Sequence, residues 1–207
     1  MNKGIKYLLI TASVALVAYN SVYVKKLSDV KAKEEKAKAF DALAYAKDYL
    51  HNKLPIRKVE AVEISKLFSE LKNSPRKAFA NSHAQNNGDI RFFMIHGQGQ
   101  VVKIDESNAY LKVAGLPSDV ILATEYIIGN AARDGSGIIS VDEFTTTMDM
   151  NTVSEEINKL IRAEVLPPFE SKVKVGDTVD FVGSIELNQT KALPKNMEVI
   201  PLILEIK

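Results

Sequence analysis

The chain has 207 residues, of which 46% are hydrophobic and 26% are charged, and its formal net charge is +1. This composition excludes a wholly disordered chain, a collagen-like repeat and a membrane protein with many spans. The near-zero charge argues against a nucleic-acid partner, and the absence of cysteine excludes disulfides, thiol nucleophiles and thiolate zinc sites.

The charges are distributed unevenly along the sequence. Residues 25–58 carry ten basic and five acidic side chains, whereas residues 59–207 carry 15 basic and 21 acidic ones. A basic collar therefore precedes an acidic body.

The segment from Tyr7 to Val24 contains no charged side chain. A helix of this length reaches roughly 27 Å, close to the ~30 Å hydrocarbon thickness of a bilayer. Near its end, no site has small residues at both of the positions that a signal peptidase requires. We therefore expect an uncleaved membrane anchor over residues 1–24, with a cleaved signal peptide as the alternative. The lysines on its two sides leave the orientation of the anchor open.

Helical patterns continue after the anchor. Residues 25–39 are rich in alanine and lysine and have little apolar stripe, which predicts a solvated helical stalk. From Phe40 the pattern is amphipathic, and we expect helices over 40–80, the last of which begins with Ser74 as its N-cap and Pro75 in its first turn.

Beyond Gly88 the hydrophobic period changes to that of strands. We expect one long strand over 90–105, bent at Gly97 and Gly99, and then strands over 110–114 and 120–128. The pattern then predicts a helix that opens with a capping box at Thr152–Glu155 and stops at Pro167–Pro168. Two final strands follow, over 178–187 with alternate apolar residues and over 197–206.

This order of elements is that of an OB-fold, a five-stranded barrel with a helix between its third and fourth strands. We therefore predict an α+β chain with an anchor over 1–24, a basic stalk over 25–39 and a globular domain over 40–207. Within that domain the OB-like barrel occupies 88–207, with residues 129–150 as an insertion. A generic α+β sheet with the same elements is the alternative.

The motifs do not assemble into a catalytic site. Residues 132–143 resemble an EF-hand loop, but Ala132 replaces its first acidic ligand, and a glycine-rich turn explains the same residues. The histidines have no metal-ligand spacing and no nucleophile motif is present, so no catalytic, cofactor or metal residue is assigned. If a ligand site forms from separate segments, its first candidates are His83, Arg91, Arg133 and Asp134.

Many short segments carry a family resemblance, and they follow one another in order along the chain. They include Tyr19–Leu27, Ser82–Ala84, Ile90–Phe93, Gly129–Asp134, Glu164–Phe169 and Glu198–Pro201. Over essentially its whole length the chain resembles a bacterial family of predicted periplasmic lipoproteins of unknown function (domain of unknown function 2291). The resemblance implies an exported body, but this chain has no cysteine to acylate. Genes of this family tend to lie beside sugar ABC-transporter genes, which implies an accessory role in uptake.

We therefore expect a non-enzymatic binding protein. Tyr7–Val24 would hold it in the inner membrane, and its body in the periplasm would bind a small ligand or a protein such as a transport component. The alternative is a hydrolase-like enzyme whose site forms only in three dimensions.

Overall fold

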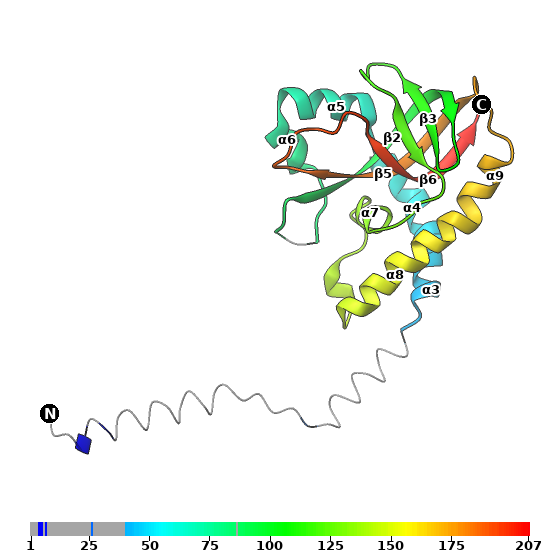
Figure 1. Ribbon diagram of the computed structural model, residues 1–207. Helices are drawn as coiled ribbons and strands as arrows, with labels where there is room; N and C mark the ends of the chain where they lie inside the picture. Colours follow the sequence, from blue (N-terminus) through cyan, green and yellow to red (C-terminus); the bar gives the residue numbers. More distant parts are fainter. Residues whose placement is uncertain (1–3, 6, 8–25, 27–39, 86) are drawn as a thin grey trace. The chain divides into compact units, whose positions relative to one another are not determined.

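The computed structural model describes residues 4–5, 7, 26, 40–85 and 87–207 (Figure 1). The chain divides into two units, Met1–Phe40 and Asp41–Lys207. Apart from residues 4–5, 7 and 26, the expected anchor segment and stalk lie outside the described residues. No helix within the described ranges is long and apolar enough to cross a bilayer.

The second unit is a mixed α+β structure. Its helices are α3 (Ala42–Asp48), α4 (Leu54–Arg57), α5 (Ile64–Asn73), α6 (Pro75–Ala80), α7 (Ala131–Asp134), α8 (Thr147–Leu160) and α9 (Leu166–Glu170). Its strands are β1 (Val62–Glu63), β2 (Ile90–Ile104), β3 (Asn108–Val113), β4 (Val120–Ala123), β5 (Thr178–Asn188) and β6 (Glu198–Ile206). π-Helical turns at Tyr49–Lys53 and Ile161–Val165 join α3 to α4 and α8 to α9.

The strands form one six-stranded sheet in the order β1-β2-β3-β4-β6-β5. The predicted long strand is confirmed as β2, which pairs with β5 over Ile90–Gln100 and with β3 over Gly99–Ile104. Because β5 pairs with both β6 and β2, the sheet curves back on itself. The strand expected over 120–128 is shorter and ends at Ala123.

The main core lies on one face of this curved sheet. Alternate residues of β5 are buried there, from Val179 and Phe181 to Ile185 and Leu187, as the alternation in the sequence predicted. Helix α5 covers part of this core with three fully or nearly fully buried side chains at helical spacing, Ile64, Leu67 and Leu71.

The predicted start of the helix after the insertion is wrong. Helix α8 begins at Thr147, and the hydroxyl of Thr146 caps it by accepting a hydrogen bond from the Asp149 amide at 3.1 Å. Thr152 lies inside the helix, where its hydroxyl donates to the Met148 carbonyl. Both threonines are followed three residues later by an acid, so the capping pattern alone cannot choose between them.

The predicted stop at Pro167–Pro168 is also wrong. The chain continues through the π-helical turn Ile161–Val165 into α9, and Pro167 falls in the first turn of that helix. A proline there loses no helical hydrogen bond, because the first N–H groups of a helix have no partner within it. At the other predicted start, Ser74 is the N-cap of α6, but its side chain makes no capping hydrogen bond.

Candidate functional site

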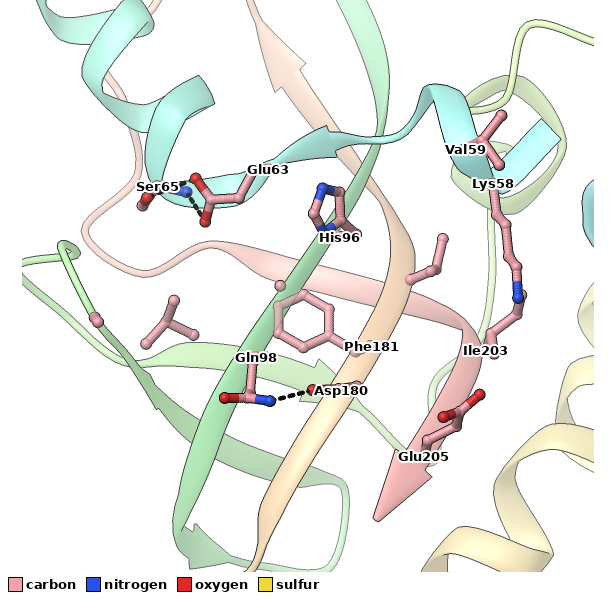
Figure 2. A pocket seen from close by; sticks show the side chains of 14 residues that line it. Lys58, Val59, Glu63, Ser65, His96, Gln98, Asp180, Phe181, Ile203 and Glu205 are labelled. Atoms are coloured by element: carbon pink, nitrogen blue, oxygen red, sulfur yellow. Dashed lines mark hydrogen bonds between the residues drawn. The ribbon is translucent and has the colours of Figure 1, made fainter. Parts of the chain in front are cut away.

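A groove of about 770 Å³ lies across β2, β5 and β6 (Figure 2). The turn after α4 and the junction between β1 and α5 form its border. Its lining residues are Lys58, Val59, Glu63, Ser65, His96, Gly97, Gln98, Val113, Ala114, Asp180, Phe181, Val182, Ile203 and Glu205. We call it the sheet groove.

Strand register arranges the lining side chains in two rows. In one row, His96 pairs with Val182, and Val182 pairs with Ile203. This row is therefore apolar apart from its histidine. The next row is polar and consists of Gln98, Asp180 and Glu205, which are paired in the same way. Successive residues of a strand point to opposite faces, so residues two apart on each strand share one face.

Gly97 leaves space for packed side chains beside the groove. A β-carbon on this residue would lie 2.8 Å from Cζ of Phe181 and 2.9 Å from Cγ2 of Ile64. Both of those side chains belong to the packed core, so neither can move away cheaply. The glycine that the sequence marked as a bend therefore leaves room for the Phe181 ring.

The polar row forms a hydrogen-bonded cluster with the last residue of the sequence. Gln98 Nε2 donates to Oδ1 of Asp180 at 2.6 Å, and Lys207 Nζ lies 3.0 Å from Oδ2 of the same carboxylate. Lys207 Nζ also lies 3.2 Å from the Glu205 carboxylate. The hydrogen bonds from Gln98 and Lys207 lower the pKa of Asp180, and the two carboxylates raise the pKa of Lys207. These contacts favour the ionised form of Asp180, and the row already holds an ammonium group.

Glu63 supplies a third carboxylate at the border. It accepts hydrogen bonds from the amides of Ser65 and Lys66 and from the Ser65 hydroxyl, so it also caps α5. Partial burial opposes ionisation, but these hydrogen bonds and the nearby His96 prevail and lower the pKa of Glu63. The three carboxylates face two ammonium groups, those of Lys58 and Lys207, so the groove has an excess of acceptors for ligand hydroxyl or amino groups.

The structure places two of the residues expected from the sequence, Arg133 and Asp134, in the protein interior. Their side chains are 4% and 2% exposed and form a bidentate ion pair, with Nε–Oδ1 and Nη2–Oδ2 distances of 2.6 and 2.8 Å. Nη1 of Arg133 donates to the Met150 carbonyl, and Gln85 Nε2 donates to Asp134. These contacts hold α7 in place and leave little of either charge for a ligand.

His83 lies near this pair in a smaller cavity of about 490 Å³, which is also lined by Arg57, Glu60 and Ser136. Burial and then Arg57 lower the pKa of His83, although Glu60 and Asp134 act in the opposite direction. The fourth expected residue, Arg91, is not among the lining residues of this cavity, and its Nε donates to Oε1 of Gln189. The structure therefore brings three of the four residues into one region, and only His83 lines a cavity there.

The EF-hand-like residues do not converge on one point. Asp134 is bound to Arg133, whereas Glu143 accepts hydrogen bonds from the Ser140 amide and the Tyr45 hydroxyl. Within the described ranges, no three His, Asp or Glu side chains are grouped as metal ligands.

Comparison with known proteins gives the family. The profile of the family described as "Predicted periplasmic lipoprotein (DUF2291)" matches residues 12–205, which is most of the chain. The chain belongs to this family. The resemblance drawn from the sequence is thus confirmed, and membership in DUF2291 supports a periplasmic body. A search of curated proteins found no significant match.

Similarity to a solved structure supports the OB-fold relationship. An OB-fold protein from Thermotoga maritima MSB8 superposes with a TM-score of 0.73 and is 25% identical. The match covers 81% of this chain and 99% of that protein. This DUF2291 member therefore has an OB-fold neighbour, as the order of elements predicted.

The residues of the sheet groove were missed at the sequence level. Strand alternation in β2 and β5 could have placed Gln98 and Asp180 on the face opposite the core. Their pairing with Glu205 depends on register across three strands, and the sequence of this DUF2291 member does not specify that register.

Proposed function

We propose that this DUF2291 protein is a non-enzymatic periplasmic binding protein and that the sheet groove is its ligand site. The observation that carries the proposal is the polar row of Gln98, Asp180 and Glu205 beside the apolar pair Val182 and Ile203. Small-molecule sites combine apolar lining with a few convergent polar groups in cavities of this size. Because β2 pairs with both β3 and β5, the strands also support our proposal of an OB-like barrel over residues 88–207.

The ligand we infer is a small molecule that carries several hydroxyl or amino groups. Asp180, Glu205 and Glu63 present carboxylate acceptors, and these outnumber the two basic groups, Lys58 and the Lys207 ammonium that lies on Asp180 and Glu205. An anionic ligand would be repelled by this excess, whereas hydroxyl and ammonium groups can donate to it. The half-buried Ile203 and the exposed Val59 offer apolar surface for the carbon skeleton.

Calorimetric titration of the full-length protein tests this proposal, with D-ribose and spermidine as the hydroxylated and cationic probes. We expect one of them to bind, and Asp180→Asn to weaken its binding about three- to tenfold. Glu106→Gln removes an exposed acid outside the groove and is the matched control. If neither probe binds at millimolar concentration, or if Asp180→Asn behaves like the control, the groove is not the proposed site.

We further propose that residues 7–24 hold the protein in the inner membrane without cleavage and leave the body in the periplasm. The uncharged segment and the family assignment support this arrangement. Protease added to spheroplasts should then digest the body, and the mature protein should retain Met1. A protected body or a shortened soluble product would contradict the proposal.

A role beside a sugar transporter is a further part of this proposal and rests on the family resemblance. Tethering at the membrane raises the local concentration of the body beside a membrane-bound partner, so a weak interface is enough for the two proteins to associate. Sugar uptake should therefore fall when the body is released from its anchor at unchanged abundance. Equal uptake by the two forms would contradict the accessory role.

His83 favours a second candidate function, a hydrolase-like enzyme. The residue lines a cavity with Ser82, Ser136 and Glu60, which are residue types that nucleophilic or acid–base catalysis uses. If the protein hydrolyses p-nitrophenyl acetate and His83→Gln abolishes that activity, the enzyme function is favoured. If the wild type and His83→Gln hydrolyse this ester at the same rate, the enzyme function is opposed.

A further inference from the structure

A second groove, of about 370 Å³, lies between the loop that follows β4 and the loop that precedes β6. We call it the rim groove. Its floor is apolar where Ala131 of α7 and Ile200 of β6 line it, and both are buried. At its edge, Tyr126 and Ile128 are 62% and 69% exposed. Large apolar side chains that are exposed beside a buried apolar floor are typical of a contact surface for another molecule.

The charged residues of the rim groove are acidic. Glu186 of β5 and Glu198 of β6 both line it and are exposed. Neither carboxylate takes part in a salt bridge with any residue that the structure describes. The antiparallel register pairs Ser184 with Ile200, and two residues further along each strand are these two glutamates. Two carboxylates that line one groove repel each other, so a cation beside them would relieve their repulsion.

We propose that the rim groove docks a segment of a partner protein that carries an apolar side chain flanked by lysine or arginine. The apolar side chain would lie between Tyr126 and Ile128, over the buried floor. The neighbouring basic groups would reach Glu186 and Glu198, and the Tyr126 ring offers a face for one of them. Charge complementarity favours this occupant over a second copy of the body, because residues 59–207 are themselves acidic.

Fluorescence polarisation with a short labelled peptide and the full-length protein tests the proposal. The peptide has a central lysine–leucine–lysine sequence. We expect it to bind and to be released by added salt. The double variant Glu186→Gln/Glu198→Gln should weaken binding about three- to tenfold, since exposed ion pairs contribute modestly. Ile128→Ser should weaken it by a similar factor without disturbing the buried floor.

The controls separate docking from general attraction between opposite charges. Glu106→Gln/Glu170→Gln removes two exposed acids outside the groove and should leave binding unchanged. Peptides with glutamate in place of lysine, or glycine in place of leucine, should bind at least tenfold more weakly. No binding at millimolar peptide, equal binding of either altered peptide, or equal loss in the control variant would overturn the proposal. Asp180→Asn should have no effect, so failure of the sheet groove as a ligand site does not decide this result.

Discussion

The Ser184 hydroxyl and Gly135 are in such close contact that a β-carbon on residue 135 would lie 2.1 Å from the Ser184 Oγ. Gly135 directly follows α7, and Ser184 is fully buried in β5. The segment can therefore lie directly on the sheet only because residue 135 has no side chain. The Ala131 carbonyl would also be 3.0 Å from the added atom.

We accordingly expect Gly135→Ala to lower the free energy of unfolding by about 1–3 kcal/mol, the usual cost of overpacking an interior. Urea denaturation followed by circular dichroism measures this change. In the double variant with Ser184→Gly, part of the loss should be recovered, because the clashing atoms are gone. Strictly additive losses in the two variants would show that this contact is not the cause.

Ser184→Ala should not lower the free energy of unfolding as Gly135→Ala does. The Ser184 Oγ is buried and has no hydrogen-bond partner among the described residues. A hydroxyl that is buried without a partner loses its hydrogen bonds to water and gains none in the protein. Its removal should therefore leave the free energy of unfolding unchanged or raise it by up to about 1–2 kcal/mol. The midpoint of the same urea transition tests this, and a loss above about 1 kcal/mol would mean that the hydroxyl has a structural role.

Asp134→Asn should be strongly destabilising. It removes the partner of a buried guanidinium, and breaking a buried ion pair on one side costs about 3–5 kcal/mol. Replacing both residues, with Arg133→Met/Asp134→Leu, should cost less than the single change because no buried charge is left unpaired. Glu156→Gln serves as the comparison, since it breaks the pair with Lys159, whose side chains are 19% and 56% exposed, and it should cost less than Asp134→Asn. A double variant less stable than Asp134→Asn would contradict this reasoning.

Local patterns predicted some elements well and others poorly. The apolar alternation from Val179 to Leu187 correctly predicted a strand with one buried face, and the helical spacing from Ile64 to Leu71 correctly predicted α5. The start of α8 was misplaced because Thr146 and Thr152 offer the same capping pattern. Only the packing of the following residues decides between two such positions, and a local pattern does not contain that information.

The candidate sites were harder to predict than the elements. Arg133 and Asp134 were expected to be candidates for binding, but their charges neutralise each other inside the fold. Adjacent residues in sequence usually point in different directions, and here a short helix lets the long arginine side chain fold back onto its neighbour. The sheet groove joins Gln98, Asp180 and Glu205 from three strands, so its prediction would have required the sheet register.

The last prediction concerns the pH dependence of stability. Burial and the nearby Arg57 lower the pKa of His83 in the folded protein, although Glu60 and Asp134 partly oppose them. In the unfolded chain the group titrates near its ordinary value of about 6.5. Below that pH the unfolded chain binds a proton that folded His83 does not accept, so the unfolded state is favoured. Stability should therefore fall as the pH decreases through about 6.5, and above that value the contribution disappears.

Urea midpoints measured at several pH values between about 5.5 and 7.5 test this expectation, because most carboxylates titrate below that window. The wild-type midpoint should fall toward the acidic end, and His83→Gln should reduce that slope. His96→Gln, a change on the exposed side of β2, keeps His83 in place and should retain the wild-type slope. Parallel curves for the wild type and His83→Gln would show that His83 is not the group responsible. A steeper loss at low pH in His83→Gln would mean that Glu60 and Asp134 outweigh burial and Arg57 at this position.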